Sequence, residues 1–120
     1  MLPAGHRLPS AETFRTAVRR GHRAGGPTLV LHLFVDPASS SPPRVGFVVG
    51  KAVGPAVVRN RVKRRLRHLV RDRLGVLPSA SLLVVRAQPA AAGASYRELD
   101  ADLDRCLGRV LARLELREMA

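Results

Sequence analysis

The 120-residue sequence predicts an α+β fold in which helices pack on one sheet. Apolar residues recur at helical spacing between 57 and 73 and again after 95, whereas apolar and polar residues alternate strictly over 28–36. A further apolar run, 81–87, has the length of a buried strand. The predicted order is helix, strands, helix, strand, helix, and the length indicates one domain spanning 1–120.

The N-terminal half supplies a helix and then strands. Ser10 is a good N-cap for a helix over 11–20, and Gly21 is a suitable stop. Residues 21–27 form a turn or a short irregular strand. In the strand over 28–36, one predicted face carries Leu29, Leu31, Leu33 and Val35, and the other carries Thr28, Val30, His32 and Phe34. After a loop, 44–50 forms a second strand, which we expect to pair antiparallel with the first through a hairpin connection.

The C-terminal half alternates helix, strand and helix. Pro55 suits the first position of the helix that precedes Gly75, and 81–87 is apolar enough for a central strand. Ser95 and Glu98 form a capping box that begins a long helix. We expect the leucine-rich side of this helix to pack on the sheet, with residues 1–9 flexible and residues 115–120 frayed.

Positive charge is concentrated before the last helix. The net charge is +12. Residues 95–120 carry five Arg and six acidic side chains, whereas residues 1–94 carry 16 basic and three acidic ones, a net charge of +13. One stripe of the middle helix carries Arg59, Lys63, Arg67 and Arg71, four residues apart. Like charges at this spacing repel, so the stripe indicates a polyanionic partner such as a nucleic acid. The alternative is an unspecialised basic surface, because Arg outnumbers Lys 19 to 2.

The sequence gives little support for a membrane protein, a disulfide-bonded protein or an enzyme with catalytic residues of its own. No apolar stretch is long enough for a membrane span or resembles a signal peptide, and Cys106 has no second cysteine to pair with, so we expect a cytoplasmic protein. The segment 46–51 is too short between its glycines for a phosphate loop. The histidines lack metal-ligand spacing, and Asp100, Asp102 and Asp104 are expected to be solvated on a charged helix. We therefore expect no catalytic residue and no metal site in the protein itself.

Ordered motifs give the chain a family resemblance. They are Arg7-Leu8, Ser10-x-x-x-Phe14, Gly21, Arg44-Val-Gly-Phe47, Gly50-Lys51, Val57-Val-Arg-Asn-Arg-Val-Lys-Arg64 and Arg67. In this order, over about residues 7–114, the chain resembles the protein subunit of bacterial ribonuclease P. The resemblance implies an α-β-β-β-α-β-α two-layer sandwich, related to a ribosomal-protein fold, with a left-handed crossover through the basic helix.

The resemblance also implies a function, 5′ maturation of transfer RNA. A large RNA subunit would carry the active site and its Mg²⁺, and the protein, with no cofactor of its own, would bind that RNA and the 5′ leader of precursor tRNA. We expect the protein alone to be monomeric. The RNA-binding residues implied by the family are Lys51, Arg59, Asn60, Arg61, Lys63, Arg64, Arg65 and Arg67. The implied leader-binding cleft contains Arg7, Phe14, Arg15, Val18, His32 and Val48.

Four positions depart from the family pattern. Val18 replaces a second aromatic residue, Ala52 replaces a basic one, and Val48 and Gly50 stand where serine is frequent. With fewer rings for base stacking, the cleft is expected to grip the leader less through stacking and more through arginines. Core packing is the competing role for Phe14, and a partly buried strand position with one satisfied hydrogen bond is the competing role for His32.

Three other functions stay open at this point. A ribosomal or general RNA-binding protein of related fold would share the basic helix. A protein that reads the DNA major groove would place that helix on duplex DNA. Against this reading, the helix has one Asn, and the other polar residues of its stripe are Arg and Lys, which bind phosphates. A protein-only nuclease would need a carboxylate cluster that the sequence does not show.

Overall fold

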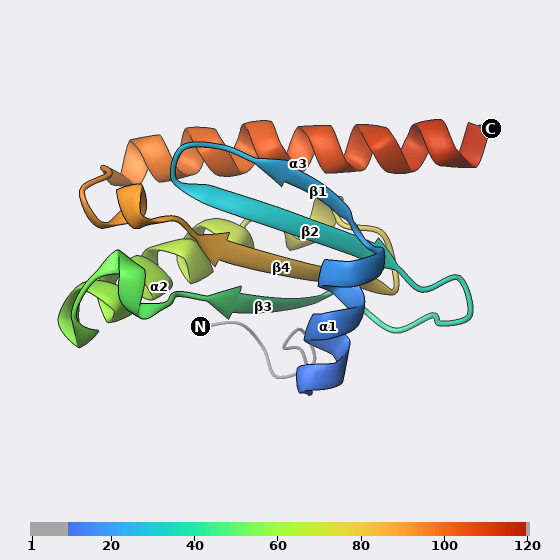
Figure 1. Ribbon diagram of the computed structural model, residues 1–120. Helices are drawn as coiled ribbons and strands as arrows, with labels where there is room; N and C mark the ends of the chain where they lie inside the picture. The colour runs from blue at the N-terminus through green and yellow to red at the C-terminus, as the bar shows by residue number, and fades with distance from the viewer. Residues whose placement is uncertain (1–9, 120) are drawn as a thin grey trace.

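A mixed four-stranded sheet organises the chain in the computed structural model, which describes residues 10–119 (Figure 1). The expectations for the 1–9 segment and for Arg7 concern residues outside this range. The elements are α1 (Ala11–Arg20), β1 (His22–Gly25), β2 (Leu29–Val35), β3 (Arg44–Val48), η2 (Lys51–Val53), α2 (Ala56–Arg71), η3 (Leu74–Val76), β4 (Ser81–Ala87), η4 (Pro89–Ala92) and α3 (Tyr96–Met119). The α-β-β-β-α-β-α order is confirmed.

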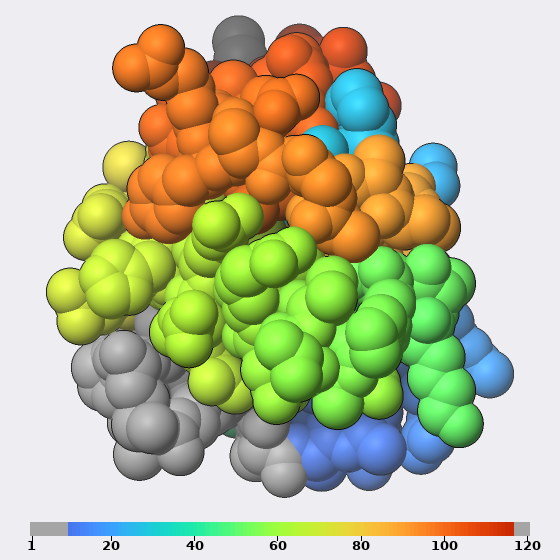
Figure 2. Space-filling model, turned by 90° about the vertical axis from the view of Figure 1, so that its left-hand side faces the viewer, coloured from blue at the N-terminus to red at the C-terminus, as the bar shows by residue number. Residues whose placement is uncertain are grey.

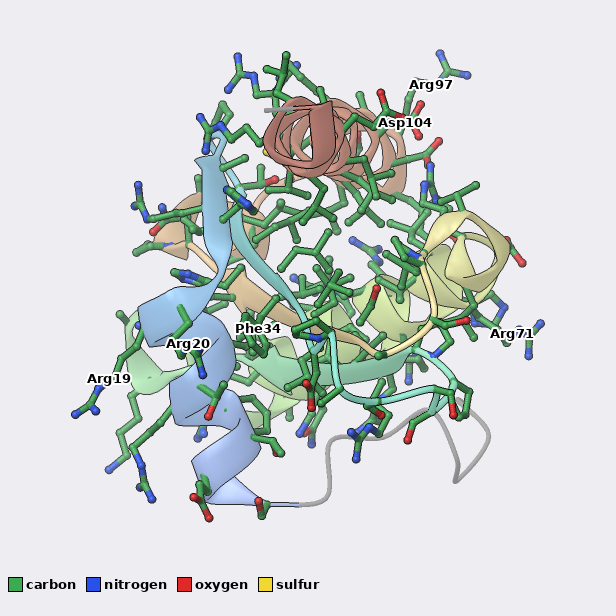
Figure 3. All side chains as sticks on the ribbon, turned by 90° about the vertical axis from the view of Figure 1, so that its right-hand side faces the viewer. Arg19, Arg20, Phe34, Arg71, Arg97 and Asp104 are labelled. Atoms are coloured by element: carbon green, nitrogen blue, oxygen red, sulfur yellow. The ribbon has the colours of Figure 1, made fainter. Side chains whose placement is uncertain are left out.

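The strand order is β1-β2-β4-β3, which corrects one prediction. Strand β3 does not form a hairpin with β2; it pairs parallel with β4, and β4 lies antiparallel to β2 between them. The physical reason is burial. Residues 81–85 of β4 are all buried, so β4 gains most from the centre, whereas β3 carries Arg44 and suits an edge. Helix α2 lies behind the sheet in Figure 1 and opposite α1 in Figure 3, so the β3-α2-β4 crossover is left-handed.

The main core lies between the sheet and helices α2 and α3. Alternation along the strands sends every second side chain to this side. The residues buried here include Leu29, Leu31, Leu33, Leu83 and Val85 from the sheet, Val62, Leu66, Leu69 and Val70 from α2, and Leu99, Leu103, Cys106, Leu107 and Val110 from α3. The predicted packing of the last helix on the sheet is therefore confirmed. Burial of each large aliphatic side chain contributes roughly 1.5–3 kcal/mol of transfer free energy.

A smaller core lies on the opposite face of the sheet, under α1. Ala17 is fully buried against Leu82 and Val84, and Phe14, Phe34 and Val48 pack partly buried around them. Helix α1 begins where expected, with Ser10 as N-cap accepting a hydrogen bond from the backbone N–H of Thr13. Helix α1 is short and crosses only part of this face of the sheet, as Figure 1 shows.

Acidic side chains on α3 anchor its neighbours, which corrects a second prediction. Asp102 is buried and not solvated: it accepts hydrogen bonds from the Thr28 backbone N–H at 3.0 Å and from the Thr28 hydroxyl, and it pairs with Arg105. Asp100 and Asp104 both pair with Arg73, just beyond α2. The helix itself begins at the expected capping box, in which Glu98 and Ser95 exchange hydrogen bonds.

Helix α2 begins one residue later than predicted. Pro55 is the N-cap and Ala56 is the first helical residue. Helix α3 continues through Met119, and the expected fraying of 115–120 stays a prediction for solution measurements.

Gly21 and Gly108 offer a matched test of packing. A Cβ at Gly21 would lie 2.8 Å from the carbonyl oxygen of Leu33, and also against that of Ala17, whereas a Cβ at Gly108 meets nothing within 4 Å. We expect Gly21→Ala to lower the free energy of unfolding by about 1–3 kcal/mol, because the end of α1 must move away from β2. Gly108→Ala should raise it by about 1 kcal/mol through helix propensity. Urea unfolding measures both; equal effects would contradict the tight approach at Gly21.

Candidate nucleic-acid interface

The basic side of α2 lies on the surface of the molecule. Figure 2 shows the helix running across one face, below the start of α3. Its buried side chains are Val62, Leu66, Leu69 and Val70, so the basic side chains on the other side extend outward, and Val57 near the start of the helix is 79% exposed. Lys51, Asn60 and Arg64 are exposed, and Lys63 and Arg67 are half-buried. Within the described part of the chain, ion pairs involve only Arg73 and Arg105 among the cations, so the charges of the α2 stripe have no carboxylate partner.

Three of the predicted RNA-binding arginines also hold the fold together. The Arg61 guanidinium donates to the Ala92 carbonyl oxygen at 2.9 Å, and Arg65 donates to that of Ala94 at 3.4 Å. Arg59 donates through Nε to the carbonyl oxygen of Gly54 at 3.1 Å. Arg61 and Arg65 thus join α2 to the segment that leads into α3, a role that sequence reasoning missed. The sequence does contain a sign of this role: each of these two arginines directly precedes a buried residue on the apolar side of α2.

A groove of about 280 Å³ lies beside α1. It is lined by Phe14, Arg15 and Val18, which the sequence analysis predicted, and by Arg19 and Arg86, which it did not. Arg86 is the exposed residue of an otherwise buried strand, and it lies opposite Val48 of β3. A charged residue within the apolar run 81–87 was the signal that could have identified it. The groove joins one aromatic ring to three guanidinium groups, which suits a flexible polyanion with flat bases.

His32 lies on the α1 face of the sheet, where alternation placed it, but it is not open to solvent. Its side chain is 7% exposed, so the structure does not support the expected open cleft at this position. The Nδ1 atom is buried and has no hydrogen-bond partner. Burial, together with the positive charges of Arg86 and Arg23, lowers the pKa of His32. His32 is therefore neutral at physiological pH and leaves one polar nitrogen unsatisfied near the groove.

The two basic surfaces lie on opposite sides of the sheet. In Figure 3, Arg19 of α1 and Arg71 of α2 extend to opposite sides. Over residues 10–119, no helix is long and apolar enough to cross a membrane, and no group of three or more His, Cys, Asp or Glu residues could hold a metal ion.

The lowered pKa of His32 predicts a pH-dependent stability. The unfolded chain, with a His pKa near 6.5, binds a proton more readily than the folded one, so stability contributed by neutral His32 is present above this pH and is lost as the pH falls below it. We expect the wild type to lose more stability than His32→Gln between about pH 8 and about pH 5. Urea unfolding across this range measures the difference; parallel curves for the two proteins would contradict it.

Comparison with known proteins identifies the family. The ribonuclease P family model matches residues 2–111. A ribonuclease P protein component of Nocardioides sp. is 60% identical over 115 residues, covering 95% of this chain and 98% of the relative. One from Streptomyces avermitilis is 58% identical, covering 92% and 96%.

Solved structures share the fold. The ribonuclease P protein of Staphylococcus aureus superposes with a TM-score of 0.76 at 22% identity, over 86% of this chain and 93% of that one. That of Thermotoga maritima superposes with a TM-score of 0.69 at 23% identity, over 87% and 94%. The family model and the sequence matches cover most of the chain, and this chain belongs to the ribonuclease P protein family.

Proposed function

We propose that the protein serves ribonuclease P by dividing two RNA-binding tasks between opposite sides of its sheet. The α2 surface binds the RNA subunit, and the α1 groove binds the 5′ leader of precursor tRNA. The observation that carries the proposal is the stripe of basic side chains on α2, whose charges have no carboxylate partner in the described part of the chain. Its family membership supports a role in 5′ maturation of tRNA.

The α2 surface suits a folded RNA. Its cations are spaced along one side of a rigid helix, whose other side is held by the core and by Arg61 and Arg65. Such a row can contact successive phosphates without rearranging, and contact releases counterions from the RNA. Lys51, in η2 before the helix, adds a further exposed cation. Asn60 adds a side chain that both donates and accepts hydrogen bonds.

The α1 groove suits a single strand. Phe14 is partly exposed and offers one ring for stacking, and Arg15, Arg19 and Arg86 surround it with positive charge. Single-stranded RNA is bound in this way, by aromatic or guanidinium planes against bases and by cations against phosphates. Val18, which is 36% exposed, adds apolar surface but no ring. Binding of the leader therefore depends strongly on charge.

We assign the chemical step to the RNA subunit and the Mg²⁺ ions it holds. The protein acts by binding and positioning, with no catalytic side chain of its own, as a cytoplasmic monomer that joins the RNA. Reconstitution with the RNA subunit across a Mg²⁺ series tests the proposal: the protein should restore precursor cleavage at low Mg²⁺. A general RNA-binding protein would bind without restoring cleavage. Cleavage with no RNA subunit would instead establish a protein-only nuclease, and preference for duplex DNA in competition would establish a DNA-binding role.

Substitutions on α2 test the RNA-subunit surface. We expect Lys63→Ala and Arg64→Ala to weaken binding to the RNA subunit and to lower the slope of log K against log salt by about one unit for each phosphate that the variant no longer neutralises. Thermal stability should stay near wild type, because both side chains lie on the basic side of α2, outside the main core. Arg61→Ala should lower both affinity and stability, since it also removes the hydrogen bond to Ala92. Filter binding over a salt series measures the slopes.

Arg97→Ala is the matched control, because Arg97 is exposed at the start of α3 and extends away from the molecule (Figure 3). Slopes that change as much in Arg97→Ala as in Lys63→Ala would remove α2 from the interface.

Phe14 tests the leader groove. We expect Phe14→Leu, which keeps apolar bulk in the small core but removes the ring, to lower holoenzyme affinity for precursor tRNA by about 1–3 kcal/mol. Affinity for mature tRNA should not change, because mature tRNA has no leader to stack. Equilibrium binding of both substrates measures the difference, and circular dichroism checks folding. Equal losses for the two substrates would assign Phe14 to core packing alone.

A further inference from the structure

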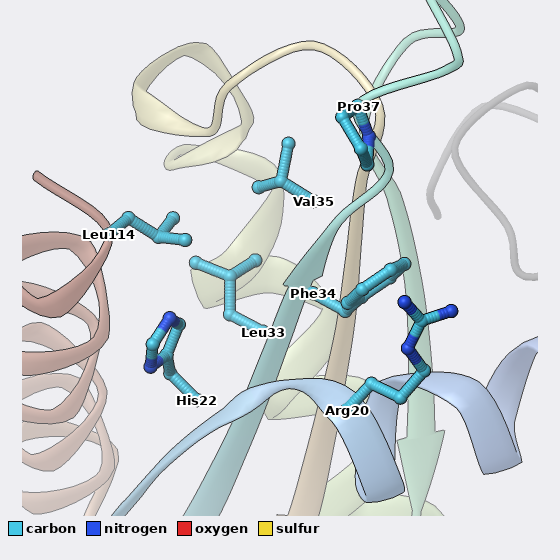
Figure 4. Close-up of a pocket in the computed structure, with 7 residues that line it drawn as sticks. All are labelled: Arg20, His22, Leu33, Phe34, Val35, Pro37 and Leu114. Carbon is cyan, nitrogen blue, oxygen red and sulfur yellow. The ribbon is translucent and has the colours of Figure 1, made fainter. Parts of the chain in front are cut away.

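A second pocket, of about 340 Å³, lies at the end of β2 (Figure 4). It opens between the end of α1, the end of β2 and the C-terminal part of α3, and we call it the β2-edge pocket. Its walls include Arg20, His22, Phe34, Val35 and Leu114. The volume lies within the range of small-ligand sites and leaves room for one nucleobase.

The β2-edge pocket combines flat, apolar and polar surfaces. The Arg20 guanidinium carbon lies over the Phe34 ring, 5.0 Å from its centroid, so the planar cation covers one face of the aromatic ring at the mouth of the pocket. Val35 and Leu114 supply an apolar wall. The Nε2 atom of His22 is buried and has no hydrogen-bond partner, although the side chain lines the pocket. The Arg20–Phe34 pair lies on the α1 face of β2 and the Val35–Leu114 wall on the opposite face, so the pocket wraps around the open edge of the strand.

The backbone at this pocket also lacks a strand partner. Strand β1 ends its pairing at His22, opposite Leu33, so over the described residues the last two residues of β2 pair with β4 alone. Backbone groups alternate in direction along a strand, so one of these two residues turns its N–H and C=O toward the open edge. A free donor beside a free acceptor is the pattern that a nucleobase edge can read.

A basic path connects this pocket to the α1 groove. A pocket of about 250 Å³ shares lining residues with both; it is lined by Arg15, Arg19 and Arg20, together with Glu12 and Thr16. Arg15 and Arg19 also line the groove, and Arg20 also lines the β2-edge pocket. The α1 groove, this pocket and the β2-edge pocket thus follow one another around α1, and each shares an arginine with the next. A strand whose base occupies the groove can continue along these arginines with its phosphates.

We propose that the β2-edge pocket binds a nucleobase of the single-stranded 5′ leader, at a position farther from the cleavage site than the nucleotide in the α1 groove. The proposal rests on the function proposed above, in which α2 faces the RNA subunit. The ends of α1 and β2, which line the β2-edge pocket, lie at the opposite end of the sheet from the start of α2 (Figure 1). The base stacks on the Arg20–Phe34 pair, and its edge meets the open backbone of β2. Arginine and aromatic planes are the usual stacking partners of splayed RNA bases.

The test uses holoenzyme reconstituted from this protein and the RNA subunit, with precursors whose leaders lengthen one nucleotide at a time. Wild type should gain affinity in two steps, the second when the leader reaches the β2-edge pocket. Arg20→Lys keeps the charge but not the plane, and Phe34→Leu keeps apolar bulk but not the ring. Each should reduce the second step by about tenfold and leave the first unchanged. Arg97→Ala, the control outside the path, should show both steps.

An abasic nucleotide at the second-step position separates stacking from general charge. It should weaken binding to wild type by about tenfold and cause no further loss in Phe34→Leu, because both changes remove the same stacking interaction. A second step that persists in both variants, or additive losses, would overturn this inference while the leader groove still accounts for the first step. Affinity independent of leader length in wild type would overturn the proposed function as well. Thermal melts verify folding, and Arg20→Lys, at an exposed position, keeps the test valid if Phe34→Leu is unstable.

Discussion

Burial of β4 on both faces is the constraint on which the rest of the structure depends. Five consecutive residues of this strand, 81–85, are buried, so helices must cover both sides of the sheet where it lies. On one side α2 and α3 supply the main core, and on the other α1 contributes Ala17 and Phe14. Because α1 is short, Arg86 of β4 stays exposed on this side of the sheet. Arg86 is one of the residues that line the α1 groove.

Placement of charge is the second organising feature. A net charge of +12 opposes compact packing through self-repulsion. The few acids are used where they compensate most: Asp100 and Asp104 pair with Arg73 at the end of α2, and Asp102 ties Thr28 to α3. Arg61 and Arg65 use carbonyl oxygens in place of acids. These contacts hold the middle of α2 and the residue just beyond its end, while the cations of the α2 stripe have no carboxylate partner among the described residues and stay available to an external polyanion.

Much of this arrangement followed from local patterns. Alternation over 28–36 assigned the faces of β2, caps at Ser10 and Ser95 located two helices, and spacing between 57 and 73 separated the buried side of α2 from its basic side. These features are local, so sequence alone contains them. The α1 groove was predicted in part, through Phe14, Arg15 and Val18, on the strength of a family resemblance.

What was missed depends on contacts between distant segments. The position of β3 beside β4 is a choice among possible partners, and burial of the whole sheet decides it. Asp102 looked solvated because its partner, Thr28, is 74 residues away. Arg86 lines the α1 groove because α1 and β3 lie beside it in the folded chain. Arg61 joins α2 to η4 through its hydrogen bond to Ala92, which is likewise close only after folding. His32 was placed on the correct face, but its burial depends on the packing around it.

The insertion of β4 between β2 and β3 has a consequence for synthesis of the chain. As the protein emerges from the ribosome, β1 and β2 can pair at once, but β3 has no neighbour until residues 81–87 have left the exit tunnel. Until then an apolar strand edge and the strongly basic α2 are both exposed to the RNA that surrounds the ribosome. Completion of the sheet is a late, long-range event, so the nascent chain meets nucleic acid before it has a finished core.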